Sequence, residues 1–165
     1  MKNTLFVFVF LFSVSSFSQK YFTRSGITEF KASVEAFEQV EAKNNSTTVI
    51  FKTDTGDIAS QLFINAFQFR VALMQEHFNE NYMESNKFPK ATFRGKLVDF
   101  DFPNIKSKKE YKLDGTLTVR GIKKEISTIA QISITDGTLN LTSSFIVEPQ
   151  DFNINIPAIV RKKIA

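Results

Sequence analysis

The sequence contains no cysteine, one histidine, and only six glycines scattered along 165 residues. Without cysteine the chain can form neither a disulfide framework nor a lipid anchor on a thiol. A single histidine argues against a zinc site, because zinc favours several His or Cys ligands. The scattered glycines provide no phosphate-binding loop and no nucleophile elbow. We therefore expect no cofactor, no metal and no enzymatic activity.

Long apolar runs are also missing, because the longest extends only from Leu5 to Phe12 and a helix needs roughly 20 apolar residues to cross a bilayer. Lys2 precedes this run and small residues end it at Ser18, which is the order of a secretory signal peptide. We expect cleavage after Ser18 and export to the periplasm or the exterior. The remainder, residues 19–165, is long enough for one domain with its own core.

The charge balance excludes a strong electrostatic field of one sign. The formal net charge is +4, and the basic residues are interspersed with 17 acidic ones. Binding of nucleic acid usually needs a clustered basic surface. We therefore expect no nucleic-acid partner.

Two turn signals divide the second half of the chain into β-hairpins. Gly121-Ile122 suits a type II′ turn and Asp136-Gly137 a type I′ turn. The first predicts the pairs Val119 with Lys124, Leu117 with Ile126, Leu113 with Ala130 and Tyr111 with Ile132; the second predicts Ile134 with Leu139, Ile132 with Leu141, Thr128 with Phe145 and Ile126 with Val147. Both hairpins place apolar side chains on one face, so a slip of one residue would bury charges.

A third hairpin is predicted around Asp54-Thr55-Gly56-Asp57, with Val49 opposite Leu62 and Phe51 opposite Ser60. Ile64 follows on the same face. The other face is apolar too and needs a cover; it carries Ile50, Phe63, Phe67 and Phe69. The following segment predicts a helix with an apolar stripe formed by Met74, Phe78 and Tyr82.

Weaker strands are expected at residues 21–34, 91–102 and 152–156, with a loop over residues 103–109. The total is eight or nine strands joined mostly by short turns. We therefore predict an all-β fold, an antiparallel lipocalin-like barrel with one short covering helix, and keep a two-sheet sandwich as the alternative.

A barrel of this size either fills its interior with side chains or holds one small ligand. An empty cavity of about 300 Å³ would cost on the order of 7 kcal/mol at roughly 24 cal/mol per Å³. That cost is comparable with a domain's whole stability, about 5–15 kcal/mol. Any such cavity should therefore be occupied.

Several polar residues invite a chemical interpretation that a structural one explains as well. Glu76, His77 and Glu80 fit a solvated helix face better than an acid/base or metal site. Asp54 and Asp57 fit a turn better than half of a calcium site. The lysines Lys106, Lys108 and Lys109 fit a solvated loop, although they could also meet an anionic bilayer surface.

Three short motifs carry a resemblance to a known family: Lys87-Phe88-Pro89, Thr92-Phe93 and the run from Gly115 to Gly121. The chain resembles the YceI-like family of envelope proteins. The resemblance implies a lipocalin-like barrel around a polyisoprenoid or other lipid, and a further strand after Pro157.

We therefore predict an exported, non-enzymatic protein that sequesters a long isoprenoid or quinone-like lipid, with possible transient contact to a membrane surface. The alternative is an interaction module with a solid core. The predicted ligand-binding residues are Phe51, Leu62, Ile64, Met74, Phe78, Phe93, Leu113, Leu117, Ile132, Leu141 and Phe145.

Overall fold

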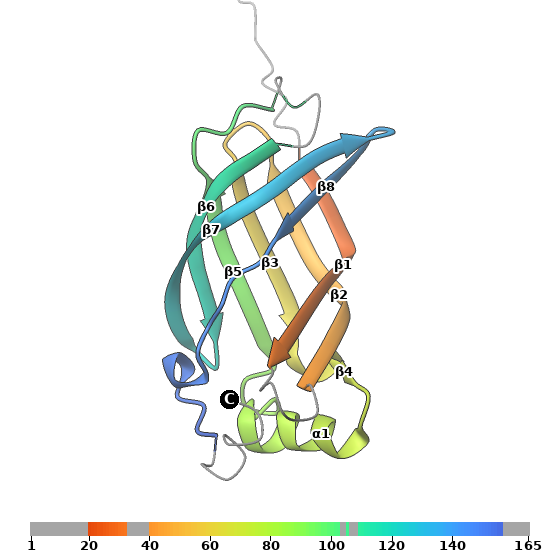
Figure 1. Ribbon diagram of the computed structural model, residues 1–165, viewed down its shortest axis with the longest axis vertical. Helices are drawn as coiled ribbons and strands as arrows, with labels where there is room; N and C mark the ends of the chain where they lie inside the picture. The colour runs from red at the N-terminus through yellow and green to blue at the C-terminus, as the bar shows by residue number, and fades with distance from the viewer. Residues whose placement is uncertain (1–19, 33–39, 103–104, 106–108, 157–165) are drawn as a thin grey trace, which may run out of the picture.

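The computed structural model describes residues 20–32, 40–102, 105 and 109–156 (Figure 1). The predicted signal peptide, Lys106, Lys108 and the segment after Ile156 lie outside the described residues. Eight strands are present: β1 (Lys20–Ala32), β2 (Val40–Lys52), β3 (Asp57–Phe63), β4 (Gln68–Phe69), β5 (Lys90–Leu97), β6 (Lys109–Val119), β7 (Ile122–Thr135) and β8 (Thr138–Ser143). The described residues also include the short helical segments η1 (Ile64–Ala66), α1 (Ala72–His77), the π-helical η2 (Phe78–Tyr82) and η4 (Pro149–Phe152).

The strands form one antiparallel sheet in the order β1-β2-β3-β5-β6-β7-β8, and β4 pairs with β2. Figure 1 shows this sheet curled into a nearly closed barrel, with α1 across one end and the β7–β8 turn toward the other. The predicted antiparallel barrel with one short helix is confirmed. Its strands alternate buried and exposed side chains, because successive side chains of a strand point to opposite faces.

The predicted β6–β7 turn is one residue too late. Arg120 and Gly121 both have positive φ, 50° and 76°, which is the requirement of a type I′ turn. The turn therefore pairs Val119 with Ile122 and Leu117 with Lys124, a register two residues from the predicted one. A shift of two keeps every side chain on its predicted face.

The β2–β3 pairing is corrected in the same way. Four residues, 53–56, connect the two strands, and the Gly56 amide donates to the Lys52 carbonyl at 2.9 Å. The longer loop places Val49 opposite Ser60 and Phe51 opposite Ile58. The inner face is again unchanged.

The β7–β8 hairpin matches the prediction near its turn, where Ile134 pairs with Leu139 and Ile132 with Leu141. However, the paired part of β8 ends at Ser143, opposite Ala130. The predicted pairs of Thr128 with Phe145 and Ile126 with Val147 are therefore absent from the described sheet.

Two predicted strand segments are also corrected. β5 ends at Leu97 instead of continuing to Phe102. The segment predicted as a strand from Phe152 begins inside η4, because Pro149 starts this 3-10 helix and Asn153 ends it with φ 54°. Phe152 itself is buried.

The second apolar face differs from the prediction, because Phe67 and Phe69 pack with Leu62 in the apolar cluster beside α1 and not on the outer face with Ile50 and Phe63. Phe78 packs on the rings of Phe30, Phe67 and Phe69, with centroids 4.9–5.7 Å apart. In contrast, Ile50 and Phe63 remain exposed, because α1 lies at the end of the barrel and not along its side.

Candidate functional site

The predicted pocket residues fall into two separate apolar clusters inside the barrel. The cluster away from α1 includes Phe51, Phe93, Leu113 and Ile132, with Leu117 and Leu141 packed against it. The cluster beside α1 includes Leu62 and Ile64, with Phe78 packed against it. Met74 is half-buried and belongs to neither cluster, and Phe145 is 42 % exposed. The structure therefore brings most of these side chains inside, but in two groups.

Phe93 occupies the inner wall because two neighbouring positions lack side chains. Gly95 and Gly115 are paired across β5 and β6. A Cβ atom added at either glycine would lie only 2.7 or 2.6 Å from Cζ of Phe93. The Phe93 ring therefore lies directly over the backbone of these two glycines. A side chain at either position would occupy the space of the ring.

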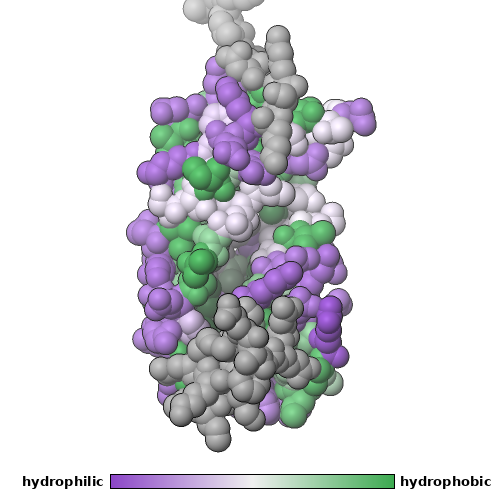
Figure 2. Space-filling view, in the orientation of Figure 1, coloured by the Kyte–Doolittle hydropathy of each residue, from purple (hydrophilic) through white to green (hydrophobic). Residues whose placement is uncertain are grey.

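The barrel wall has an open seam, because the sheet begins at β1 and ends at β8 and the described strands show no pairing between them. The segment 144–148 that follows β8 is exposed throughout. Figure 2 shows a recess beside this segment with hydrophobic side chains at its margin. Phe145 stacks on Phe93 with centroids 6.3 Å apart, so an exposed ring contacts the core directly at the seam.

A groove of about 600 Å³ lies between β7 and the segment 144–146. Two residues that line this groove are hydrogen-bonded to each other: the Thr128 hydroxyl donates to the Ser144 carbonyl at 2.7 Å. Lys124, which also lines it, forms an ion pair with Asp151 of η4. These contacts tie the chain after β8 to β7 although the strand pairing has ended.

A buried polar region on β1 and β2 was not predicted from the sequence. Asn44 is fully buried; its Nδ2 donates to the Phe63 carbonyl and its Oδ1 accepts from the Ser46 amide, both at 2.9 Å. The hydroxyls of Thr28 and Thr47 hydrogen-bond at 2.7 Å. The register is irregular around Gly26. The polar run from Asn44 to Thr48 was the available signal for this irregularity.

Arg120 was also missed, although it lies within a recognised motif. Its side chain is 16 % exposed and forms an ion pair with Glu84. It also donates to the Asn153 carbonyl at 2.6 Å and lies over the Phe88 ring. Arg120 thus joins the segment after η2 and the end of η4 to the β6–β7 turn.

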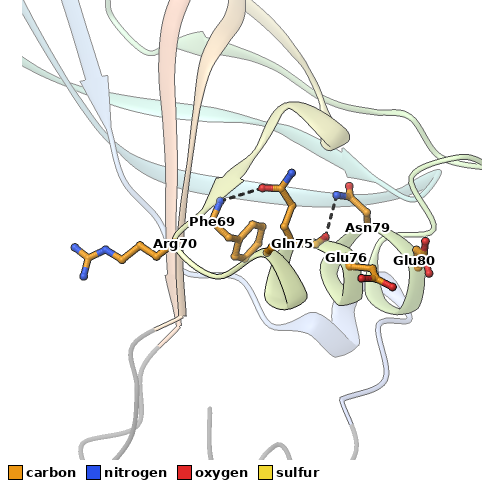
Figure 3. A pocket seen from close by; sticks show the side chains of 7 residues that line it. Phe69, Arg70, Gln75, Glu76, Asn79 and Glu80 are labelled. Atoms are coloured by element: carbon orange, nitrogen blue, oxygen red, sulfur yellow. Dashed lines mark hydrogen bonds between the residues drawn. The ribbon is translucent and has the colours of Figure 1, made fainter.

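The helix carries a second, smaller groove of about 440 Å³ (Figure 3). Asn79 donates to the Gln75 carbonyl at 2.9 Å, and Gln75 Oε1 accepts from the Phe69 amide at 3.3 Å. Glu76 and Glu80 are exposed on the outer side of this helical segment. Their placement agrees with the interpretation as a solvated face.

The acidic turn around Asp54 also has a structural explanation. The Thr55 hydroxyl donates to Asp57 at 2.7 Å, and Lys52 lies 3.8 Å from the same carboxylate. Among the described residues, no group of three or more His, Cys, Asp or Glu side chains could hold a metal ion. In that same part of the chain, no helix is long and apolar enough to cross a membrane.

The carboxyl group of Asp114 has a lowered pKa. Lys112 and Ser127 donate hydrogen bonds to Asp114 at 2.8 and 2.7 Å, and they hold the pKa of Asp114 below its usual range. This carboxylate lies on the outer face of β6, away from the seam.

Comparison with solved structures shows the same fold in three bacterial proteins of low sequence identity. A polyisoprenoid binding domain from Saccharophagus degradans has a TM-score of 0.70 and 11 % identity, covering 83 % of this chain and 82 % of that one. For BcnA of Burkholderia cenocepacia the TM-score is 0.67 and the identity 14 %, with coverage of 84 % and 87 %. A YCEI protein of Campylobacter jejuni has a TM-score of 0.56 and 15 % identity, covering 99 % of this chain and 92 % of that one.

Comparison with curated protein sequences gives no match. The family model of the YceI-like domain, in contrast, matches residues 9–165, which is nearly the whole chain. The motifs at Lys87–Pro89 and Gly115–Gly121, the antiparallel barrel and this match agree. The chain belongs to the YceI-like domain family.

Proposed function

We propose that the protein binds a long apolar lipid, of polyisoprenoid or quinone-like type, within the barrel and carries it by burial without chemistry. The observation that carries this proposal is the seam, where the exposed Phe145 ring stacks on the buried Phe93 ring. An apolar chain can meet a continuous apolar path at this point, from the surface into the core. The solved polyisoprenoid binding domain with this fold supports the same ligand class.

Affinity in such a site grows with the length of the chain. Each methylene group removed from water contributes about 0.8 kcal/mol. The bound chain would lie along the inner wall past Phe93 and Leu117, where the cluster away from α1 borders the cluster beside α1. The clusters themselves then define the ends of the site.

A polar end group would find one unused hydrogen-bonding group inside. The Tyr111 hydroxyl is buried in the cluster away from α1 and has no hydrogen-bond partner among the described residues. Leaving a buried hydroxyl unpaired is unfavourable, so an oxygen atom of the ligand would stabilise it. Tyr111→Phe should weaken binding of a quinone or prenol and leave binding of a plain hydrocarbon unchanged.

We also propose that the protein works outside the cytoplasm and contacts a membrane surface transiently. The charged, apolar and small-residue order of residues 1–18 supports export. Isoprenoid lipids reside in membranes because of their apolar chains, so a carrier must approach a bilayer to load. Blocking cleavage after Ser18 should retain a larger precursor, which immunoblotting of cell fractions would detect.

The direct test of lipid binding is an organic extract of gently purified protein, analysed by mass spectrometry. A stoichiometric isoprenoid or quinone, together with saturable uptake of an apolar dye that the lipid displaces, is expected. Protein that yields no lipid and takes up no dye would contradict the proposal.

The second candidate function is a protein-interaction module with a solid core. It is favoured by the close packing of one cluster, where Leu97, Ala130 and Ile132 are completely buried. Absence of dye uptake combined with a defined protein partner would support it instead.

A further inference from the structure

The outer face of β1, β2, β3 and β5 carries large apolar side chains in water. Phe22 is 55 %, Ile50 41 % and Phe63 46 % exposed. Phe22 and Ile50 are direct partners across β1 and β2, and Ile50 faces Ala59 on β3. These residues form a continuous apolar row across three strands, with Phe63 further along β3.

The same face is strongly basic. Residues 20–24, 48–52, 57–63 and 90–96 of these strands contain one carboxylate, Asp57, which forms an ion pair with Lys52 at 3.8 Å. The cations in these ranges are Lys20, Arg24, Lys52, Lys90, Arg94 and Lys96. We call this combination of apolar row and cations the basic apolar face.

The excess of positive charge is local to this part of the strands. Further along β1 and β2, Lys43 lies 3.1 Å from Glu29, and Glu41 lies near both Lys31 and Arg70. On the basic apolar face, in contrast, Lys20 lies directly opposite Lys52. Like charges at facing positions destabilise a sheet, and Asp57, which already pairs with Lys52, can balance only one of the six cations. The excess of positive charge therefore favours a partner of opposite charge.

Cations and exposed rings are combined side by side. The Arg24 guanidinium lies 5.3 Å from the centre of the Phe22 ring, and Lys90 Nζ lies 5.1 Å from the centre of the Phe63 ring. A bilayer surface has the same combination, because anionic phosphates lie just above apolar chains. A nucleic acid would pair with the cations but would offer little apolar surface to Ile50.

We propose that the basic apolar face binds the surface of a bilayer that contains anionic phospholipids. The role of this docking rests on the proposed function, because it would bring the barrel to the membrane that holds the lipid. The docking itself does not depend on lipid binding. β1 is the strand at the open seam, so docking through this face holds the seam beside the bilayer.

The test is co-sedimentation of the full mature chain with vesicles of phosphatidylcholine alone or mixed with phosphatidylglycerol. Binding to the mixed vesicles is expected, with a loss at 1 M salt, where the screening length falls to about 3 Å. Equal binding to both vesicle types, or binding to polyglutamate but not to vesicles, would overturn the proposal.

Matched double variants distinguish binding by this face from an effect of net charge or of exposed apolar surface elsewhere on the barrel. Ile50→Ser with Arg94→Gln removes one exposed apolar side chain and one cation from the face, and should weaken vesicle binding about tenfold. Ile129→Ser with Lys123→Gln makes the same changes on the outer side of β7, where Ile129 is also exposed. Equal weakening by both double variants would refute the assignment.

Uptake of an apolar dye in solution distinguishes this inference from the proposed function. The variant with Ile50→Ser and Arg94→Gln should retain dye uptake and the circular dichroism of the native barrel, because both side chains are exposed on the outside. If this variant lost both dye uptake and vesicle binding, the result would contradict the separation of the two sites.

Discussion

Phe93→Ala tests whether the Phe93 ring borders the lipid path. Phe93 is 8 % exposed, and a phenylalanine buries about 150–250 Å². At about 25 cal/mol per Å² this area corresponds to about 4–6 kcal/mol, and measured core truncations of this type cost about 3–5 kcal/mol. Since Phe145 and the open seam adjoin this ring, water can enter the vacated space, and we expect a loss near the lower value.

The same substitution should strengthen lipid binding. Removing the ring exposes the bare backbone at Gly95 and Gly115 to the barrel interior. Each further methylene group of the lipid that this space buries should tighten binding about fourfold. Urea unfolding with and without an added isoprenoid measures both effects, because a ligand present at 100 times its Kd stabilises the folded state by about 2.7 kcal/mol.

Phe51→Ala is the matched control for this experiment. Phe51 belongs to the same cluster and is 2 % exposed, but its ring packs on Phe100 at 5.2 Å and, within the described part of the chain, does not stack on Phe145. It should lose similar stability without any gain in lipid affinity. Equal changes of lipid affinity in Phe93→Ala and Phe51→Ala, or weaker lipid binding by Phe93→Ala, would show that the Phe93 ring does not border the lipid path.

Three further predictions concern the parts that hold the barrel together. Arg120→Met should destabilise the protein by about 2–3 kcal/mol, as expected for hydrogen bonds to charged groups, and a double-mutant cycle with Glu84→Gln should give coupling above about 0.5 kcal/mol. Leu117→Asp should abolish cooperative thermal unfolding, since it places a carboxylate on the inner face; a native melting curve would contradict this. The lowered pKa of Asp114 means that its stabilising effect is complete above its unfolded value of about 3.9 and is lost as the pH falls through the lower folded value. Lys112→Ala should raise the Asp114 titration midpoint in NMR, and an unchanged midpoint would refute the stated cause.

The faces of the strands beside the predicted turns were predictable from the sequence alone. Alternation of apolar and polar residues has a period of two, and a hairpin register wrong by two residues leaves each side chain on the same side. The inward positions of Leu113, Leu117 and Ile132 were therefore correct although the β6–β7 turn was misplaced by one residue. The turn at Asp136-Gly137 was correct because its signal is contained in two adjacent residues.

The candidate site depended on contacts between distant parts of the chain. The apolar residues Phe145 and Val147, which alternation places on the same side as Leu141, predicted a longer β8, but the pairing ends at Ser143, the polar residue between Leu141 and Phe145. In the folded chain, burial of Phe152 and the ion pair of Lys124 with Asp151 accompany the departure of this segment from β7.

The sequence by itself determined which side of β2, β3, β6 and β7 faces the interior, since that choice follows from alternation along a few residues beside each turn. The tertiary structure alone decided that the wall stays open between β1 and β8, and that the Phe93 ring lies over two glycines from adjacent strands. Both features depend on contacts between segments that are far apart in the sequence. Their outcome is set by packing across the barrel and not by any local preference.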